Sequence, residues 1–309
     1  MSTFQYEFLL TGSSGFLGRT ILQHIGRAKT LTLGRDASNN IKADFKKFIP
    51  ELPACRTVVH SAGKAHVIPK TDVEKQDFFA VNHAGTLKLL KRLEDQPPEL
   101  FVFISSVAVY GREQGESIDE SAELKGSTPY ALSKIYAENA IKEWCVKRSI
   151  AHLILRLPLV VGLEAPGNLS AISNMIKHGR YIRIAGNHAR KSMVLAEDVA
   201  AFIGQAHPGS GTYNLTDGIH PAFSKFENGL ATLHSKKIQW TLPLLPLKVG
   251  AKLGDFLIAL NCPCPLSSDR LQKMISSLTF CDNLARKEIG WQPRPVLNHL
   301  DQMIAMENQ

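Results

Sequence analysis

Cysteines are few in this chain of 309 residues, and their positions form no pattern. The five cysteines are an odd number at irregular spacing, and Cys262 and Cys264 lack the second Cys or His pair that a zinc site requires. A disulfide framework is therefore not expected, and neither is a metal site. We expect structural thiols and a reducing compartment, the cytoplasm.

Segments that direct a chain to a membrane are also lacking. The first residues have no basic stretch followed by an apolar core, so we expect no signal peptide. The most apolar region, residues 242–266, contains three charged residues and four prolines, which makes it a poor transmembrane helix. We expect no integral membrane segment and interpret this region as buried or interfacial structure, with weak contact to a membrane surface left open.

Runs of basic residues are absent although the chain is basic. The 36 Lys and Arg residues and 28 Asp and Glu residues give a formal net charge of +8, but the charges are dispersed. Aromatic and basic residues do not alternate as a surface for stacking bases requires, so no nucleic-acid partner is expected. A phosphate-rich cofactor and a nucleotide-linked substrate explain the positive charge equally well.

Short apolar runs alternate with segments of helical spacing through the first half of the chain. Strands are predicted at 6–11, 30–33, 57–60, 101–105 and 152–155, and helices at 15–25, 77–93 and 130–148. The looser second half predicts helices at 170–178 and 198–206 and extended segments at 183–185 and 212–215. Fully apolar strands between helices indicate a parallel sheet covered on both faces.

The predicted fold is therefore α/β, a doubly wound Rossmann-type parallel sheet with a smaller, interleaved C-terminal substrate domain. Residues 1–157 are expected to form the dinucleotide-binding domain, with 190–218 returning to it. Residues 158–189 and 219–309 are expected to form the smaller domain.

A glycine-rich segment follows the first predicted strand and opens the first predicted helix. It reads Gly12-Ser13-Ser14-Gly15-Phe16-Leu17-Gly18, and this context makes a glycine fingerprint indicate dinucleotide binding. The first glycine permits a tight turn, the second lets the backbone approach the pyrophosphate, and the third lets the helix pack close to the strand. We expect all seven residues to contact the cofactor, with the helix N-terminus facing the phosphates.

The end of the second predicted strand bears on the choice between NAD and NADP. A carboxylate there binds the ribose 2′-hydroxyl of NAD, whereas an arginine accommodates the 2′-phosphate of NADP. Gly34 stands where the acid is expected, and Arg35 follows it. The sequence thus favours NADP(H), with NAD(H) as the alternative if Arg35 is solvated and Asp36 binds the ribose.

A tyrosine and a lysine one helical turn apart are candidates for proton transfer. Tyr130 and Lys134 share one face of the predicted helix 130–148. A nearby ammonium favours phenolate and lowers the pKa of a tyrosine from its usual value of about 10. Ser106, at the end of a central strand, could bond the same substrate oxygen. A redox enzyme that moves a hydride to or from a carbinol or carbonyl carbon is predicted.

These residues resemble the extended short-chain dehydrogenase/reductase family, the NAD-dependent nucleotide-sugar epimerases and dehydratases. The resemblance continues at 58–62, 81–86, 109–111, 155–158 and 288–293, along nearly the whole chain. It implies a nucleotide-sugar substrate, UDP-linked, held by the smaller domain. It also implies a homodimer formed through the helices at 78–93 and 130–148.

The resemblance assigns roles to single residues. Ser106, Tyr130 and Lys134 match the family's catalytic serine, tyrosine and lysine, and Lys134 would also hold the nicotinamide ribose. Further cofactor contacts are expected from Asp44, at the adenine, and from Ser61, Ala62, Gly63, Asn82, Ser105 and Leu157. The expected substrate-binding residues are Ser106, Asn168, Arg190 and Lys191, of which Lys191 stands where many members have an arginine.

The family includes three candidate activities. Sugar 4,6-dehydratases carry an Asp-Glu pair directly after the catalytic hydroxyl residue, but Val107 and Ala108 stand there, so dehydration is not expected. A 4-epimerase and a 4-ketoreductase share the catalytic residues and differ in whether the cofactor returns the hydride or departs oxidised. Segments 156–169 and 213–218 resemble a bacterial group that serves surface-polysaccharide synthesis and includes reductases of UDP-4-keto-6-deoxy-N-acetylglucosamine.

Gly34 and Arg35 favour the reductase, because the family's epimerases hold NAD. We therefore expect 4-keto reduction of a UDP-4-keto-6-deoxy-hexosamine. The alternative is a 4-epimerase of UDP-glucose or UDP-N-acetylglucosamine. A non-catalytic NADP-sensing or RNA-binding relative is a further alternative, which the intact set of catalytic residues opposes.

Overall fold

A seven-stranded parallel sheet forms the centre of the protein, for which a computed structural model describes residues 4–65, 67–205, 209–260, 262, 264 and 266–303. The strand order is β11-β7-β5-β4-β1-β2-β3. The strands are β1 (Tyr6–Thr11), β2 (Thr30–Gly34), β3 (Ile41–Lys42), β4 (Cys55–His60), β5 (Leu100–Ser106), β7 (Ala151–Leu157) and β11 (Gly211–Asn214).

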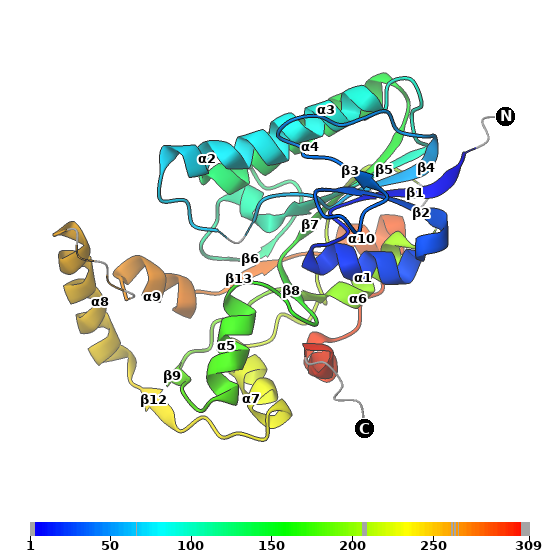
Figure 1. The fold of residues 1–309 in the computed structure, drawn as a ribbon. Coiled ribbons are helices and arrows are strands. Elements are labelled where there is room, and N and C mark those ends of the chain that lie inside the picture. Colours follow the sequence, from blue (N-terminus) through cyan, green and yellow to red (C-terminus); the bar gives the residue numbers. More distant parts are fainter. Residues whose placement is uncertain are drawn as a thin grey trace.

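Helices cover both faces of this sheet, as Figure 1 shows. One face carries α2 (Asp72–Phe78), the π-helical segment η2 (Phe79–Ala84), α3 (Gly85–Arg92) and α4 (Pro129–Lys147). The other carries α1 (Phe16–Ile25), α6 (Ala196–Ile203) and α10 (Asn283–Ile289). The predicted doubly wound α/β fold is confirmed.

Alternating side chains of the apolar strands fill two separate cores. On β1, Leu9 packs in the core beneath α3 and α4, whereas its neighbour Leu10 packs in the core beside α1 and α6. Successive strand residues point to opposite faces, so a strand that is buried on both sides has to be apolar throughout. This requirement explains why the five strands predicted from apolar runs all form.

The strand order reverses next to β1, where β2 and β3 extend the sheet in one direction and β4 in the other. Open α/β sheets bind their ligands outside the carboxyl ends of the strands at such a reversal. Here β1 and β4 end on Thr11 and His60, which are register partners. The sheet therefore places its ligand crevice beyond these two residues.

A smaller lobe of helices and short strand pairs lies beside the sheet (Figure 1). Its strands pair as β8 (Leu159–Val161) with β10 (Met193–Leu195), and β9 (Ile182–Ile184) with β12 (Trp240–Leu242), while β6 (Gly115–Ile118) pairs with β13 (Leu278–Phe280). Its helices are α5 (Asn168–Lys177), α7 (Phe223–Leu233), α8 (Leu244–Ala259) and α9 (Ser268–Ile275). Short 3₁₀ turns are η1 (Arg27–Lys29), η3 (Val107–Tyr110) and η4 (Val296–Met303).

Some helix boundaries differ from the prediction. The single helix predicted at 77–93 is the succession of α2, η2 and α3, and it begins at Asp72. It starts there because Thr71 and Glu74 form a capping box, each side chain bonding the other's backbone N–H. The helix predicted at 198–206 begins at Ala196 and ends at Ile203, and residue 206 lies outside the described residues.

Residues 242–266 were expected to be buried or interfacial. Burial does not hold for most of α8, whose outward side chains are exposed, and the interfacial alternative stays a prediction. Positions 261, 263 and 265 lie outside the described part of the chain. Across the residues that the structure describes, no helix combines the length and the apolar character needed to cross a bilayer.

The division into domains stays a prediction. β11 and α6, from the segment expected to return to the sheet, pack against β7 and α1. α10 and Trp291, which were expected in the smaller domain, pack in the core beside α1 and α6. We therefore propose that residues 283–291 belong with the sheet.

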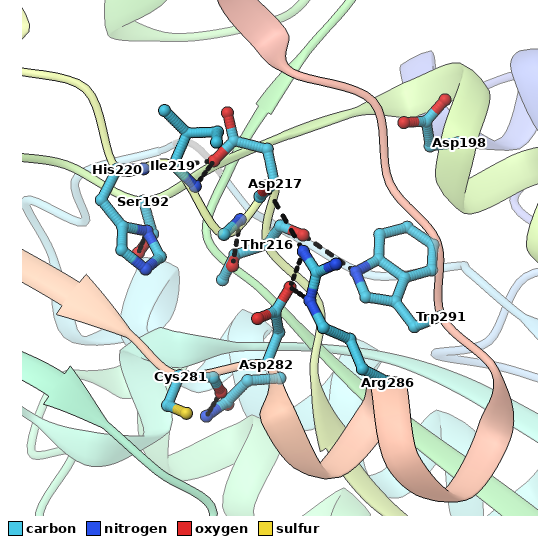
Figure 2. A network of polar contacts seen from close by, with 12 residues as sticks. Ser192, Asp198, Thr216, Asp217, Ile219, His220, Cys281, Asp282, Arg286 and Trp291 are labelled. Atoms are coloured by element: carbon cyan, nitrogen blue, oxygen red, sulfur yellow. Dashed lines mark hydrogen bonds and ion pairs between the residues drawn. The ribbon is translucent and has the colours of Figure 1, made fainter.

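A polar network fastens this C-terminal segment to the loop after β11, as Figure 2 shows. The Trp291 indole N–H donates to the carbonyl of Thr216 at 2.8 Å. Arg286 pairs with the Asp282 carboxylate at 2.9 Å and donates to the carbonyl of Asp217. One oxygen of the Asp217 carboxylate accepts the backbone N–H of Ile219, and the other accepts the backbone N–H of Val296.

Replacing Trp291 by alanine is expected to lower the free energy of unfolding by about 3–5 kcal/mol, because a buried indole is removed and the Thr216 carbonyl loses its donor. The matched control is Trp240→Ala, because Trp240 is 62% exposed and its loss should change stability by less than about 0.5 kcal/mol. Urea unfolding followed by circular dichroism measures both, and equal losses would contradict this assignment.

Candidate active site

The loop between β1 and α1 has the shape that its three glycines predict. Gly12 adopts a φ of +76°, and a Cβ there would lie 2.7 Å from the Ala62 nitrogen. A Cβ on Gly18 would lie 1.9 Å from the Gly12 carbonyl oxygen, so only glycine lets α1 approach the turn. The first turn of α1 contains no acidic residue, which leaves its positive dipole end suited to an anionic phosphate. This loop fits a dinucleotide.

A cavity of about 380 Å³ opens between this loop and the ends of the central strands. The expected residues that line it are Gly12, Gly15, Phe16, Leu17, Gly18, Ser61, Gly63, Ser105, Ser106, Tyr130, Lys134 and Leu157. Thus the glycine loop and the proton-transfer candidates, 120 residues apart in the chain, share one cavity of a size typical for small ligands.

Several lining residues were not anticipated. They are Ala65, Ile104, Pro158, Leu159, Val160, Pro166 and Leu169. All seven are apolar, and each lies within three residues of an expected position. Five of them fall in segment 156–169, whose resemblance to the family was the available signal. Ala65 and Ile104 have neither a polar side chain nor a defined spacing, so sequence reasoning had no signal for them.

Ser106 reaches the cavity from the last position of β5. Its Oγ accepts the backbone N–H of Ala108 at 3.2 Å and so caps the short turn η3. Its register partner across the sheet is Leu157 of β7, another lining residue. The hydroxyl is thereby fixed at the carboxyl edge of the sheet.

Tyr130 and Lys134 reach the cavity from the start of α4. That helix begins there because the hydroxyl of Thr128 accepts the N–H of Ala131 and Pro129 occupies the first helical position. The Tyr130 ring meets the Phe78 ring edge-on, with centroids 6.2 Å apart. The Lys134 ammonium donates to the Ile104 carbonyl at 2.8 Å. All three proposed catalytic side chains are therefore brought to one place.

Burial governs the protonation of this group. It raises the pKa of Tyr130, against the effect of a hydrogen bond with Ser106. It lowers the pKa of Lys134 to about 8, against the attraction of the Glu138 carboxylate. The expectation that Lys134 lowers the pKa of Tyr130 is wrong for this structure, because desolvation of the phenol dominates. Tyr130 is a neutral phenol at physiological pH, which suits it to donating a proton.

A buried polar network behind the cavity was missed by sequence reasoning. The Glu138 carboxylate accepts Arg156 Nη2 at 2.7 Å and the Ser105 hydroxyl at 2.5 Å. Arg156 also donates to the Tyr110 hydroxyl, which donates to the side chain of Asn214. Since Glu138 lies one turn after Lys134, the network fixes α4 against β5 and β7. A charged residue inside an apolar strand, at Arg156, was the available signal.

A directed chain of hydrogen bonds joins the ends of β1 and β4 to η2. The Thr86 hydroxyl donates to the Asn82 carbonyl, so it must accept from His60 Nε2 at 2.9 Å. The other ring nitrogen then accepts from the Thr11 hydroxyl at 2.7 Å, and Thr11 accepts the N–H of Ala62 at 3.1 Å. His60 is therefore neutral and protonated on Nε2.

Two expected cofactor residues bond to other parts of the chain. Asn82 is buried, and its amide bonds the backbone of Lys64 and the Ser133 hydroxyl, so it does not line the cavity. Ser13 is buried and donates to the Asn39 side chain at 2.6 Å. Asn39 fills the space beside Gly34, since a Cβ on Gly34 would lie 2.9 Å from its Nδ2. Their contacts with a cofactor stay predictions.

Four other expected cofactor residues do not line the cavity. Ala62 contributes its backbone N–H to Thr11, as described above. Ser14 and Arg35 are exposed, and Arg35 lies just past the end of β2. Asp44 is half-buried and accepts the backbone N–H of Lys46. The cofactor contacts of all four stay predictions.

The expected substrate cations lie outside the cavity. Arg190 donates to the carbonyls of His220 at 2.8 Å and Ile219 at 2.9 Å. Lys191 donates to the carbonyl of Lys273 at 3.0 Å, and burial lowers its pKa. Asn168 begins α5, but its side chain lies outside what the structure describes. Their substrate contacts stay predictions.

Replacing His60 by glutamine is expected to make folding less sensitive to acid. Burial lowers the pKa of His60 to about 3, so below its ordinary pKa of about 6.5 the unfolded chain binds a proton that the folded chain does not. Stability is therefore lost as the pH falls from that value, with a slope approaching about 1.4 kcal/mol per pH unit. Glutamine does not titrate, so His60→Gln removes this loss of stability at low pH.

The measurement is urea unfolding of both proteins from neutral pH down to about pH 4. The difference between the two slopes isolates His60 from the carboxylates, which both proteins share. Parallel slopes would contradict the neutral, buried state of His60.

Comparisons with known proteins show which family this chain resembles. The profile of the NAD dependent epimerase/dehydratase family matches residues 8–215. The UDP-glucose 4-epimerase of Vibrio cholerae is 25% identical over 94% of this chain and 92% of its own. The N-acetyl-alpha-D-glucosaminyl-diphospho-ditrans,octacis-undecaprenol 4-epimerase of Escherichia coli O157:H7 is 26% identical over 63% of this chain and 61% of its own.

Solved structures share the fold. The UDP-glucose 4-epimerase of Thermotoga maritima, solved with UDP-glucose, has a TM-score of 0.73 at 16% identity over 96% of both chains. RMD from Pseudomonas aeruginosa, complexed with NADPH, has a TM-score of 0.70 at 18% identity over 96% of this chain and 98% of its own. The family match spans the glycine loop, Ser106, Tyr130 and Lys134, and with it the chain belongs to the NAD-dependent epimerase/dehydratase family.

Proposed function

We propose that this protein is an NADP(H)-dependent oxidoreductase that acts at C4 of a nucleotide-activated sugar. Its proposed reaction is the 4-keto reduction of a UDP-4-keto-6-deoxy-hexosamine in surface-polysaccharide synthesis. The observation that carries the proposal is the single cavity shared by the glycine loop, Ser106, Tyr130 and Lys134. A cofactor bound at the glycine loop and a sugar bound beside Tyr130 would meet in this cavity.

Each side chain has one part in the proposed reaction. When bound, the nicotinamide supplies the hydride. The phenol of Tyr130 donates its proton to the C4 oxygen, and the Ser106 hydroxyl bonds the same oxygen. Lys134 is an ammonium below its pKa of about 8. It would hold the ribose of a bound nicotinamide cofactor. The raised pKa of Tyr130 keeps the phenol protonated, as a reductive step requires.

A 4-epimerase is the second candidate. The names of the Vibrio cholerae and Escherichia coli relatives favour it, and the second name extends the substrate class to a sugar carried on a polyprenyl diphosphate. Such an enzyme would first oxidise C4 and then reduce the opposite face of the ketone, so no cofactor would be consumed. Dehydration is opposed by Val107 and Ala108, which carry no acid or base where dehydratases have an Asp-Glu pair.

We further propose a homodimer formed through α3 and α4. Their outer faces carry exposed apolar side chains, with Leu87 at 44%, Tyr136 at 45% and Val146 at 69%. Apolar side chains of this kind on two neighbouring helices suit a second copy of the chain.

Incubation of the purified protein with NADPH and UDP-4-keto-6-deoxy-N-acetylglucosamine is expected to oxidise one NADPH per keto sugar reduced, followed by cofactor absorbance. A parallel sample with UDP-N-acetylglucosamine alone is analysed for its C4 epimer. Epimer formation without net loss of cofactor would overturn the reductase and establish the second candidate.

The variant Tyr130→Phe provides the control for this assay. It removes only the phenolic oxygen, so cofactor binding should persist while turnover falls by about 100- to 10,000-fold. Near-normal turnover of this variant would count against Tyr130 as the proton donor.

Replacing Arg35 by alanine is expected to raise the KM for NADPH by roughly 10- to 100-fold, because a charged hydrogen bond to the 2′-phosphate is lost. The KM for NADH should change little. The matched control is Arg27→Ala, an exposed arginine in η1, which precedes β2 at the opposite end of that strand. Equal effects of Arg35→Ala on the two cofactors would refute the preference for NADP.

A further inference from the structure

Helix α8 turns an apolar stripe toward solvent. Leu245 is 74% exposed, Val249 56%, Leu253 62%, Phe256 63% and the following Leu260 58%. Residues three or four apart lie on the same side of a helix, so these five form one continuous stripe. In a soluble protein, such side chains normally face a core, and a contiguous exposed patch marks a docking surface.

The stripe cannot turn inward, because the opposite side of α8 is already packed. Ala251 is fully buried in a small core with Ile184 and Leu271. A Cβ on Gly254 would lie 1.8 Å from the carbonyl oxygen of Leu266, so α8 touches the following chain there backbone to backbone. This packing sets the orientation of the helix, and among the described residues the apolar stripe is left exposed.

Exposed lysines accompany the stripe. Lys248 and Lys252 are exposed on α8, and within the described residues neither has an ion-pair partner. The acidic residue of α8, Asp255, accepts the backbone N–H of Ser268 at 2.9 Å. Lys236 and Lys237 are exposed just before β12.

An exposed aromatic side chain lies on the strand that leads into α8. Trp240 of β12 is 62% exposed, and Leu242 of the same strand is 41% exposed. Both precede α8 directly in the chain. An apolar stripe, flanking lysines and a tryptophan at one edge are the features of a helix that lies in the headgroup region of a membrane.

We propose that α8 and β12 seat this protein on the surface of an anionic lipid bilayer. The apolar stripe and Trp240 enter the boundary between headgroups and acyl chains, and the lysines face lipid phosphates. At 1.5 Å per residue α8 is about 24 Å long, shorter than the hydrocarbon core of about 30 Å, so the helix lies along the surface.

Charge favours a bilayer over a second copy of the chain. A symmetric pairing through α8 would bring two sets of the same lysines together, whereas an anionic bilayer neutralises them. Figure 1 shows α8 at the outer end of the smaller lobe, away from α3 and α4. The proposed dimer face therefore stays accessible on a bound molecule.

Sedimentation of the full chain with vesicles tests the proposal. Binding is expected to vesicles of mixed phosphatidylcholine and phosphatidylglycerol, with much weaker binding to phosphatidylcholine alone and release at high salt. The double variant Leu253→Asn, Phe256→Asn should bind at least about tenfold more weakly. Lys248→Gln and Lys252→Gln should each weaken binding by roughly fivefold.

Controls separate binding from misfolding. Phe48→Asn changes another exposed aromatic residue, 59% exposed between β3 and β4, and should bind like the wild type. Circular dichroism and NADPH oxidation in solution should match the wild type for all α8 variants.

Brominated lipids should quench the fluorescence of Trp240, and this quenching should be lost in Trp240→Phe, because Trp144 and Trp291 are buried.

Three results would overturn the proposal. They are no binding of the wild type to anionic vesicles, wild-type binding by the double variant, and self-association that the double variant abolishes without any vesicle binding. The last result would assign the stripe to a second copy of the chain. None of them bears on the reaction at C4, which is measured without lipid.

Discussion

The buried ion pair between Arg156 and Glu138 is the interaction on which the arrangement of the active site depends. The two side chains are 3% and 0% exposed, so each charge would be severely destabilising without the other. The Ser105 hydroxyl donates a further hydrogen bond to Glu138, and Arg156 donates one to the Tyr110 hydroxyl. The pair ties α4 to β7 and, through Ser105, to β5. The turn of α4 that precedes Glu138 is thereby held where its side chains reach the carboxyl ends of the strands.

Desolvation then sets the chemistry of that turn. The same burial raises the pKa of Tyr130, which holds the phenol neutral. It lowers the pKa of Lys134 to about 8, so the ammonium form is favoured only below that pH. On the other side of the cavity, the glycine loop and the chain from Thr11 through His60 to η2 are held without any charge. A site built in this way keeps a protonated phenol at the cavity for the proposed proton transfer.

Much of this architecture could be predicted from the sequence, because strands buried on both faces must be apolar and the glycine loop permits no side chain at Gly12 or Gly18. The remainder depends on contacts between distant residues. The partners of Arg190 and Lys191 are backbone carbonyls, and the place beside Gly34 is filled by Asn39. Composition suggested that the region of α8 was buried or interfacial, whereas only packing shows which side faces solvent.

The most direct test of the account follows the hydride itself. NADPH that carries deuterium at C4 of the nicotinamide ring is incubated with the protein and the 4-keto sugar nucleotide, and the product is examined by NMR and mass spectrometry. The account predicts deuterium at C4 of the sugar, one for each cofactor oxidised. Because the transfer takes only one of the two hydrogens at C4 of the nicotinamide, both positions carry deuterium. A product without deuterium, or with deuterium at another carbon, would then contradict the account.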